Sequence, residues 1–111
     1  MKDLKISKEL IKAVLQKETE TLSKGFSFTL NDNYIEFSDD GELLFEYCIY
    51  EFTFKCKEWA LSKGYFIYST NELSFIKTFS LETIETFSNG KDTEIECILK
   101  ACEWILEYKE N

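Results

Sequence analysis

Four cysteines are the residues of this 111-residue chain most able to do chemistry, because thiolates bind zinc and act as nucleophiles. They are Cys48, Cys56, Cys97 and Cys102. Structural zinc sites usually use paired ligands about two to four residues apart, whereas seven and four residues separate these pairs. Cys56 and Cys102 fall at apolar positions of predicted helices, where a thiol packs as a small hydrophobic group. We therefore expect reduced cysteines that pack in the core, and no bound metal.

Two absences limit the chemistry further. The chain has no histidine, and its thirteen basic residues are all lysine. Without histidine, no side chain has an ordinary pKa near neutrality, so neither acid–base catalysis nor an activated cysteine is expected. Without arginine, no side chain can grip a carboxylate or phosphate with two parallel hydrogen bonds. We expect a protein that is not an enzyme and that needs no cofactor.

A lysine-free acidic stretch runs from Gly25 to Phe54. Its acids are Asp32, Glu36, Asp39, Asp40, Glu42, Glu46 and Glu51, so these seven residues contribute −7 to a net charge of −8. The plain interpretation is a solvated face. The sharper one is a surface that docks a basic partner or that imitates a nucleic-acid backbone. The candidate partner-binding residues are Asp32, Glu36, Asp39, Asp40 and Glu42. Nucleic acid and anionic membranes would be repelled.

The same stretch offers hard oxygen ligands for a divalent cation. Asn31 to Asn33 and Asp39 to Glu42 supply carboxylates and amides. They do not follow the twelve-residue calcium loop, which needs glycine at position six and glutamate at position twelve. Metal binding is therefore kept only as an alternative function.

A repeated segment suggests how these residues are positioned. Leu22 to Phe26 reads Leu-Ser-Lys-Gly-Phe, and Leu61 to Tyr65 reads Leu-Ser-Lys-Gly-Tyr. In both copies a helical pattern precedes the glycine and an aromatic strand pattern follows it. Gly25 and Gly64 each sit where a left-handed helix cap would fall. The pattern predicts two equivalent helix-to-strand corners and a duplicated helix–hairpin unit.

Periodicity extends this prediction along the chain. Apolar spacing predicts helices from Ser7 to Gly25, from Ile49 to Gly64 and from Thr93 onward, with a capping box at Thr93 and Glu96. Strands are predicted at 26–30, 34–37, 65–68 and 73–79, with optional third strands at 43–45 and 82–87, and turns at 31–33, 39–41, 71–72 and 89–90. The expected fold is a single α+β domain over residues 1–111, ordered α-β-β-(β)-α-β-β-(β)-α, with helices packed on a mostly antiparallel sheet.

Two tryptophans near predicted helix ends have two interpretations. Trp59 and Trp104 are each preceded by glutamate. Tryptophan is common at binding hot spots, so the pair could anchor a partner. Helical spacing alone also explains large apolar residues on a buried face, and we favour core packing.

Short segments resemble small proteins encoded by phages and prophages. They are Phe54-Lys55-Cys56-Lys57-Glu58-Trp59-Ala60, Lys63-Gly64-Tyr65 and Lys100-Ala101-Cys102-Glu103-Trp104-Ile105. This resemblance implies a mobile-element origin and no particular activity. The element order, small size and acidic charge also resemble type III secretion chaperones, which are dimeric α+β proteins that hold extended effector segments; that likeness is one of topology only.

The leading hypothesis is a small acidic interaction protein, encoded by a phage or mobile element, that binds a basic protein partner. The first alternative is a self-associating, chaperone-like module that binds extended client segments, which leaves a homodimer open. The start of the chain, Met1 to Lys5, resembles no export signal, and no apolar run reaches membrane-spanning length. We expect a cytoplasmic protein.

Overall fold

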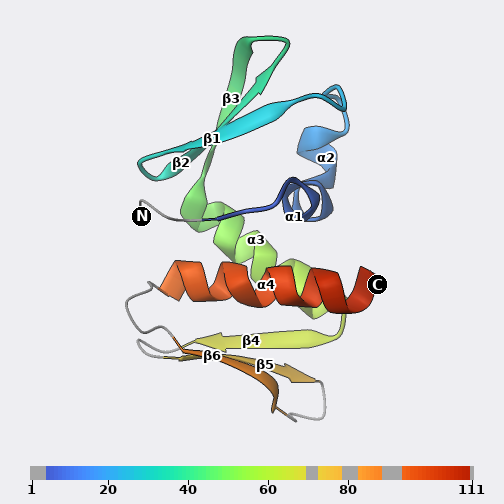
Figure 1. Cartoon of the computed structure of the whole chain (residues 1–111), viewed down its shortest axis with the longest axis vertical. Coiled ribbons are helices and arrows are strands. Elements are labelled where there is room, and N and C mark those ends of the chain that lie inside the picture. The colour runs from blue at the N-terminus through green and yellow to red at the C-terminus, as the bar shows by residue number, and fades with distance from the viewer. Residues whose placement is uncertain (1–4, 70–72, 79–82, 89–93, 111) are drawn as a thin grey trace.

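A computed structural model describes residues 5–69, 73–78, 83–88 and 94–110 (Figure 1). The elements are α1 (Lys8–Val14), α2 (Gln16–Thr19), β1 (Ser27–Asn31), β2 (Tyr34–Asp39), β3 (Glu42–Cys48), α3 (Ile49–Ser62), β4 (Tyr65–Ser69), β5 (Leu73–Thr78), β6 (Thr83–Ser88) and α4 (Glu94–Glu110). The predicted α+β class and the antiparallel pairing are confirmed. The order differs in detail from the prediction, because the first helix is split in two and both optional strands are formed.

The strands form two separate antiparallel sheets rather than the single expected sheet. Sheet A has the order β1-β2-β3, and sheet B has the order β4-β5-β6. Figure 1 shows sheet A above α3 and α4, with α2 beside it, and sheet B below α4. Helix α3 begins directly after β3 and ends two residues before β4. Its 14 residues span about 21 Å. The two meanders are therefore held apart by the length of a helix and share no ladder.

The core is formed where both sheets meet the helices. Fully buried side chains come from α1 (Leu10, Ile11), β2 (Ile35, Phe37), α3 (Phe52, Cys56), β5 (Ile76) and α4 (Leu99, Cys102, Ile105). Phe52, Cys56 and Ala60 repeat at a spacing of four residues on α3, so one face of this helix is buried. The prediction that residues 49–62 form a helix, and not a strand, is thereby confirmed.

The first predicted helix ends early. Leu15 is fully buried but leaves the helical conformation, with φ −106° and ψ 52°. Helix α2 then extends only to Thr19, whose hydroxyl donates to the Leu15 carbonyl oxygen at 2.8 Å. The expectation of one helix from Ser7 to Gly25 is therefore wrong. Burial of the Leu15 side chain in the core outweighs continuation of a single helix through this position.

The two glycine corners are not equivalent. Gly64 follows α3 with a φ of 96°, as a left-handed cap requires. Gly25 lies six residues beyond the end of α2 and does not have a positive φ. The prediction that Gly25 caps a helix in the left-handed conformation is wrong, because the similarity of the two segments does not extend to the preceding helix end.

This difference predicts opposite responses to alanine. Gly64→Ala is expected to lower the free energy of unfolding by about 1–2 kcal/mol, because a Cβ atom is strained at positive φ. Gly25→Ala is expected to be neutral or to stabilise by up to about 1 kcal/mol, because a Cβ there would meet only Ser23 Oγ, at 4.0 Å. Urea unfolding of both variants measures the difference, and equal effects would contradict it.

Two predicted turns join the strands of sheet A. Asp40 (φ 54°) and Gly41 (φ 82°) form a two-residue hairpin turn between β2 and β3, where both central residues need positive φ. Asp32 (φ 53°) lies in the turn between β1 and β2. The other predicted turns, at 71–72 and 89–90, and the Thr93 half of the predicted capping box lie outside the described residues.

Candidate functional site

The predicted acidic residues lie along sheet A. On β2, Ile35 and Phe37 are buried in the core, and Glu36 between them points to the opposite face. The register places Thr29 of β1 and Glu46 of β3 on either side of Glu36. Two carboxylates therefore lie opposite each other on the outer face of sheet A, an arrangement that destabilises a sheet.

The other candidates lie at the two ends of this sheet. Asp32 is in the β1–β2 turn, whereas Asp40 and Glu42 are at the β2–β3 turn. The six residues of β2 separate the two turns by roughly 20 Å. The structure thus arranges the predicted residues in a line along the sheet, with Glu36 near the middle.

Asp39 differs from the other four because it has a structural role. One carboxylate oxygen accepts the backbone N–H of Ser23 at 2.8 Å, and the other accepts the Ser23 hydroxyl at 2.5 Å. These two bonds hold the pKa of the Asp39 carboxyl below its ordinary value. Asp39 therefore ties the segment after α2 to the end of β2.

The bonds to Ser23 predict a pH dependence of stability. Because the pKa of Asp39 is lower in the folded state, its contribution is present above the unfolded pKa and is lost as the pH falls through the folded value. Asp39→Asn is expected to destabilise the protein at neutral pH and to converge with the unsubstituted protein as the pH is lowered from neutrality to below 3.8, the ordinary pKa of this carboxyl. Urea unfolding across this range tests it; a constant difference at every pH would contradict it.

Sequence reasoning missed an exposed apolar surface beside the acidic strands. Tyr50 and Phe54 on α3 are 54% and 64% exposed. Tyr50 and Phe54 border a hollow of about 370 Å³ that also contacts Tyr47 of β3. Their four-residue spacing, on the face of α3 opposite Phe52, was the signal that could have revealed this surface.

Lys55 is the cation nearest to this hollow. Its Nζ lies 3.4 Å from a Glu18 carboxylate oxygen and 5.8 Å from the centre of the Tyr47 ring. The hydrogen bond with Tyr47 raises the pKa of Lys55, and the Glu18 charge adds to this effect. Lys55 therefore joins α2, α3 and β3 as a charged group.

A second hollow, of about 650 Å³, lies between α1, the end of α3 and α4. Trp59 lines it and is half-buried against the core. Glu103 of α4 also lines it, but its carboxylate accepts the backbone N–H of Ser7 at 3.0 Å and the Ser7 hydroxyl at 2.6 Å. Ser7 is the N-cap of α1, as predicted. One carboxylate of this hollow, that of Glu103, therefore attaches α1 to α4.

The two tryptophans near the helix ends pack against the core, which is the interpretation that the sequence favoured. Trp59 and Trp104 are both partly buried against the core. The Trp104 ring stacks on Tyr108 of the same helix at 4.8 Å between centroids. This packing accounts for both tryptophans without a ligand.

The cysteines occupy core positions. Cys56 and Cys102 are fully buried, as predicted, and Cys48 is half-buried at the start of α3. The Cys102 thiol lies 3.6 Å from the Cys56 carbonyl oxygen. Burial raises the pKa of the Cys56 thiol well above its ordinary value, so this sulfur stays protonated and a poor nucleophile. Within the described ranges, no three metal-ligating side chains gather into a cation site.

The described helices are all too short or too polar to cross a bilayer. Comparison of the chain with protein-family models, with curated proteins and with solved structures gave no match.

Proposed function

We propose that this protein is a non-enzymatic interaction protein, and that the outer face of sheet A binds a basic segment of a partner protein. The observation that carries this proposal is the pair Glu36 and Glu46, which lie opposite each other on neighbouring strands. In the described part of the chain, neither carboxylate forms an ion pair with a lysine. The candidate residues Asp32, Asp40 and Glu42 extend the same negative surface to both ends of the sheet.

The physical argument is that this pair costs stability and has no role in folding. Two unit charges about 5 Å apart in water repel by roughly 0.8 kcal/mol. A lysine or arginine placed between them would turn that repulsion into attraction. Groups that oppose folding are expected mainly where function requires them. The negative field of sheet A would also accelerate encounter with a positively charged partner.

The origin and history of the chain are part of the same proposal. The segments at 54–60, 63–65 and 100–105 support an origin in a phage or mobile element, and the protein would act in the host cytoplasm. The paired Leu-Ser-Lys-Gly segments, and the occurrence of a helical region before each three-stranded meander, support a duplication of one ancestral unit.

The test compares two variants with equal loss of charge. In the first, Glu36→Gln, Asp40→Asn and Glu42→Gln neutralise sheet A. In the control, Glu9→Gln, Glu20→Gln and Glu107→Gln neutralise exposed helical or loop positions. Proteins captured from host cytosol by the unsubstituted chain are expected to be lost with the first variant and kept with the control.

A second readout is the dependence of capture on salt: capture by the unsubstituted chain and by the control variant should fall as the salt concentration rises, because charge attraction is screened. Asp39 is left unchanged, since its bonds to Ser23 stabilise the fold. Equal capture of every partner by both variants would refute the proposal.

A further inference from the structure

Strand β3 is an open edge. In the part of the chain that the structure describes, β3 is hydrogen-bonded to β2 alone. Sheet A lies on the far side of the helices from sheet B, so the second meander cannot cover this edge (Figure 1). An uncovered edge presents backbone N–H and C=O groups that can pair with another extended chain.

The register shows which residues present those groups. The N–H of Ile49 donates to the Asn33 carbonyl oxygen at 2.8 Å, so this opposite pair is hydrogen-bonded. Opposite pairs alternate in an antiparallel ladder, so Tyr47 and Phe45 direct their backbone groups toward β2. Glu46 then directs its N–H and C=O away from the sheet. Its side chain is on the outer face, in the acidic line.

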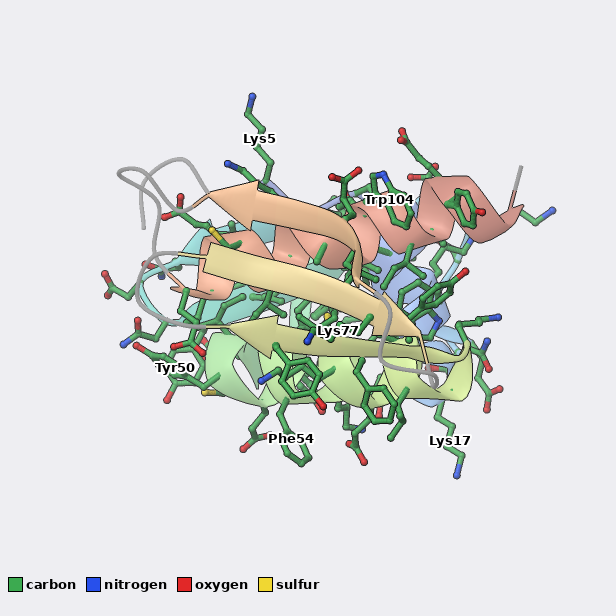
Figure 2. The ribbon with its side chains drawn as sticks, turned by 90° about the horizontal axis from the view of Figure 1, so that it is seen from below. Lys5, Lys17, Tyr50, Phe54, Lys77 and Trp104 are labelled. Atoms are coloured by element: carbon green, nitrogen blue, oxygen red, sulfur yellow. The ribbon has the colours of Figure 1, made fainter. Side chains whose placement is uncertain are left out.

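The hollow bounded by Tyr47, Tyr50 and Phe54 lies beside this edge on the other face of the sheet. Tyr47 is on the inner face of β3, and its ring borders the hollow. Figure 2 shows Phe54 projecting from the side of α3 away from α4. Tyr50 and Phe54 also border another hollow, of about 500 Å³, that they share with Ile95 and Ile98 of α4. A strand added next to β3 would place every second side chain on the inner face beside Tyr47. Such a side chain could enter the hollow.

The charge around the edge selects the occupant. Glu46 lies on the edge strand, and Glu51 and Glu58 border the hollow. The cation at the hollow, Lys55, is already paired with Glu18. A second copy of this chain would bring another set of seven acids from residues 25–54 against the first set and would be repelled. A chain rich in lysine or arginine would be attracted.

We propose that the edge of β3 binds an extended basic segment of the partner as a fourth strand of sheet A. This inference rests on the proposed function and specifies its mode of binding. The added strand runs antiparallel to β3. Its basic side chains lie on the outer face beside Glu46, with Glu36 one strand further on, and the alternate apolar side chains lie on the inner face, one of them in the hollow beside Tyr47. Backbone pairing supplies affinity, and the alternation supplies selectivity.

The test uses three synthetic peptides. The parent is Lys-Val-Lys-Phe-Lys-Val-Lys; the second is N-methylated at its internal lysines, and the third at its Val and Phe residues. In an antiparallel pair, the residue opposite Glu46 has its side chain on the same face and its N–H toward β3. Methylating the lysines should therefore weaken binding at least tenfold, whereas methylating Val and Phe should change it little. Fluorescence anisotropy measures both.

Two variants of the protein separate backbone pairing from charge. Glu46→Gln and Glu46→Pro both remove the carboxylate, but only proline removes the outward N–H, and the ladder with β2 is kept. We expect the proline variant to bind the parent peptide at least tenfold more weakly than the glutamine variant. Circular dichroism checks that both variants fold. If the proline variant does not fold, the comparison of the methylated peptides alone tests backbone pairing.

Each result has a defined meaning. Equal binding of both methylated peptides, with loss of binding in salt, would overturn strand addition and leave the charge-based function standing. Selective loss on methylating Val and Phe would overturn the antiparallel direction. Absence of parent binding, or a dimer in sedimentation that the peptide dissociates, would overturn the basic occupant. The capture experiment tests the proposed function independently of the peptides: if that function is wrong, the sheet A variant and the control variant capture the same proteins.

Discussion

Phe52→Ala is expected to lower the free energy of unfolding by about 3–5 kcal/mol, the largest effect of any single truncation on α3. The Phe52 ring is fully buried within the cluster that joins α1, α3 and α4 to both sheets. Removing it loses the burial of its apolar surface and leaves a cavity that the surrounding rings and methyl groups cannot fill. Urea unfolding followed by circular dichroism measures the change.

Phe54→Ala is the matched control, because it deletes the same ring two residues away on the opposite side of the helix. At 64% exposure, little of its surface is buried by folding. We expect a change within about 0.5 kcal/mol in stability. The variant should nonetheless weaken binding of the Lys-Val-Lys-Phe-Lys-Val-Lys peptide, because Phe54 borders the hollow beside β3. Similar losses of stability in both variants would contradict the buried and exposed faces assigned to α3.

Phe37→Ala is expected to have a comparable cost, about 3–5 kcal/mol, concentrated in sheet A. The Phe37 ring is fully buried and stacks on Phe45 at 4.7 Å between centroids. Phe26 and Phe28 lie 6.2 Å and 6.4 Å from it. One residue thus holds the inner faces of all three strands together, and its loss removes several ring contacts at once.

The location of this loss is measurable by amide hydrogen exchange. We expect amides of β1, β2 and β3 to exchange faster in Phe37→Ala, and amides of β5 and α4 to change less, because sheet B shares no ladder with sheet A. Tyr34→Ala, in the same strand but exposed on the outer face, is the control and should cost less than about 1 kcal/mol. Uniform acceleration across both sheets would show that the two meanders unfold as one unit.

The stability of sheet A bears directly on the proposed binding. The acidic line and the β3 edge exist only while Phe37 and its neighbouring rings hold the three strands in register, because a slip of one residue would exchange the Glu36 and Phe37 faces. Binding measurements on any variant of this sheet therefore need a parallel measurement of unfolding. A variant that keeps its stability and loses the peptide identifies a contact residue, as intended for Glu46→Pro.

The sequence alone determined the features that depend on neighbours a few residues apart. The apolar spacing at 49–62 distinguished a helix from a strand, and the strand pattern at 34–37 located β2. The pair Asp40 and Gly41 marked the tight hairpin, since positive φ is accessible to few residues. The lysine-free stretch located the negative charge before any fold was known.

Only the tertiary structure decided how these parts combine. The bond between Ser7 and Glu103 joins residues 96 positions apart, and the bond between Ser23 and Asp39 spans 16. Neither has a local pattern that predicts it, and the second distinguishes a structural aspartate from the exposed acids around it. The break at Leu15 and the division into two sheets have the same origin. Burial of whole faces against distant elements outweighs the small local preferences of a helix end or a repeated glycine.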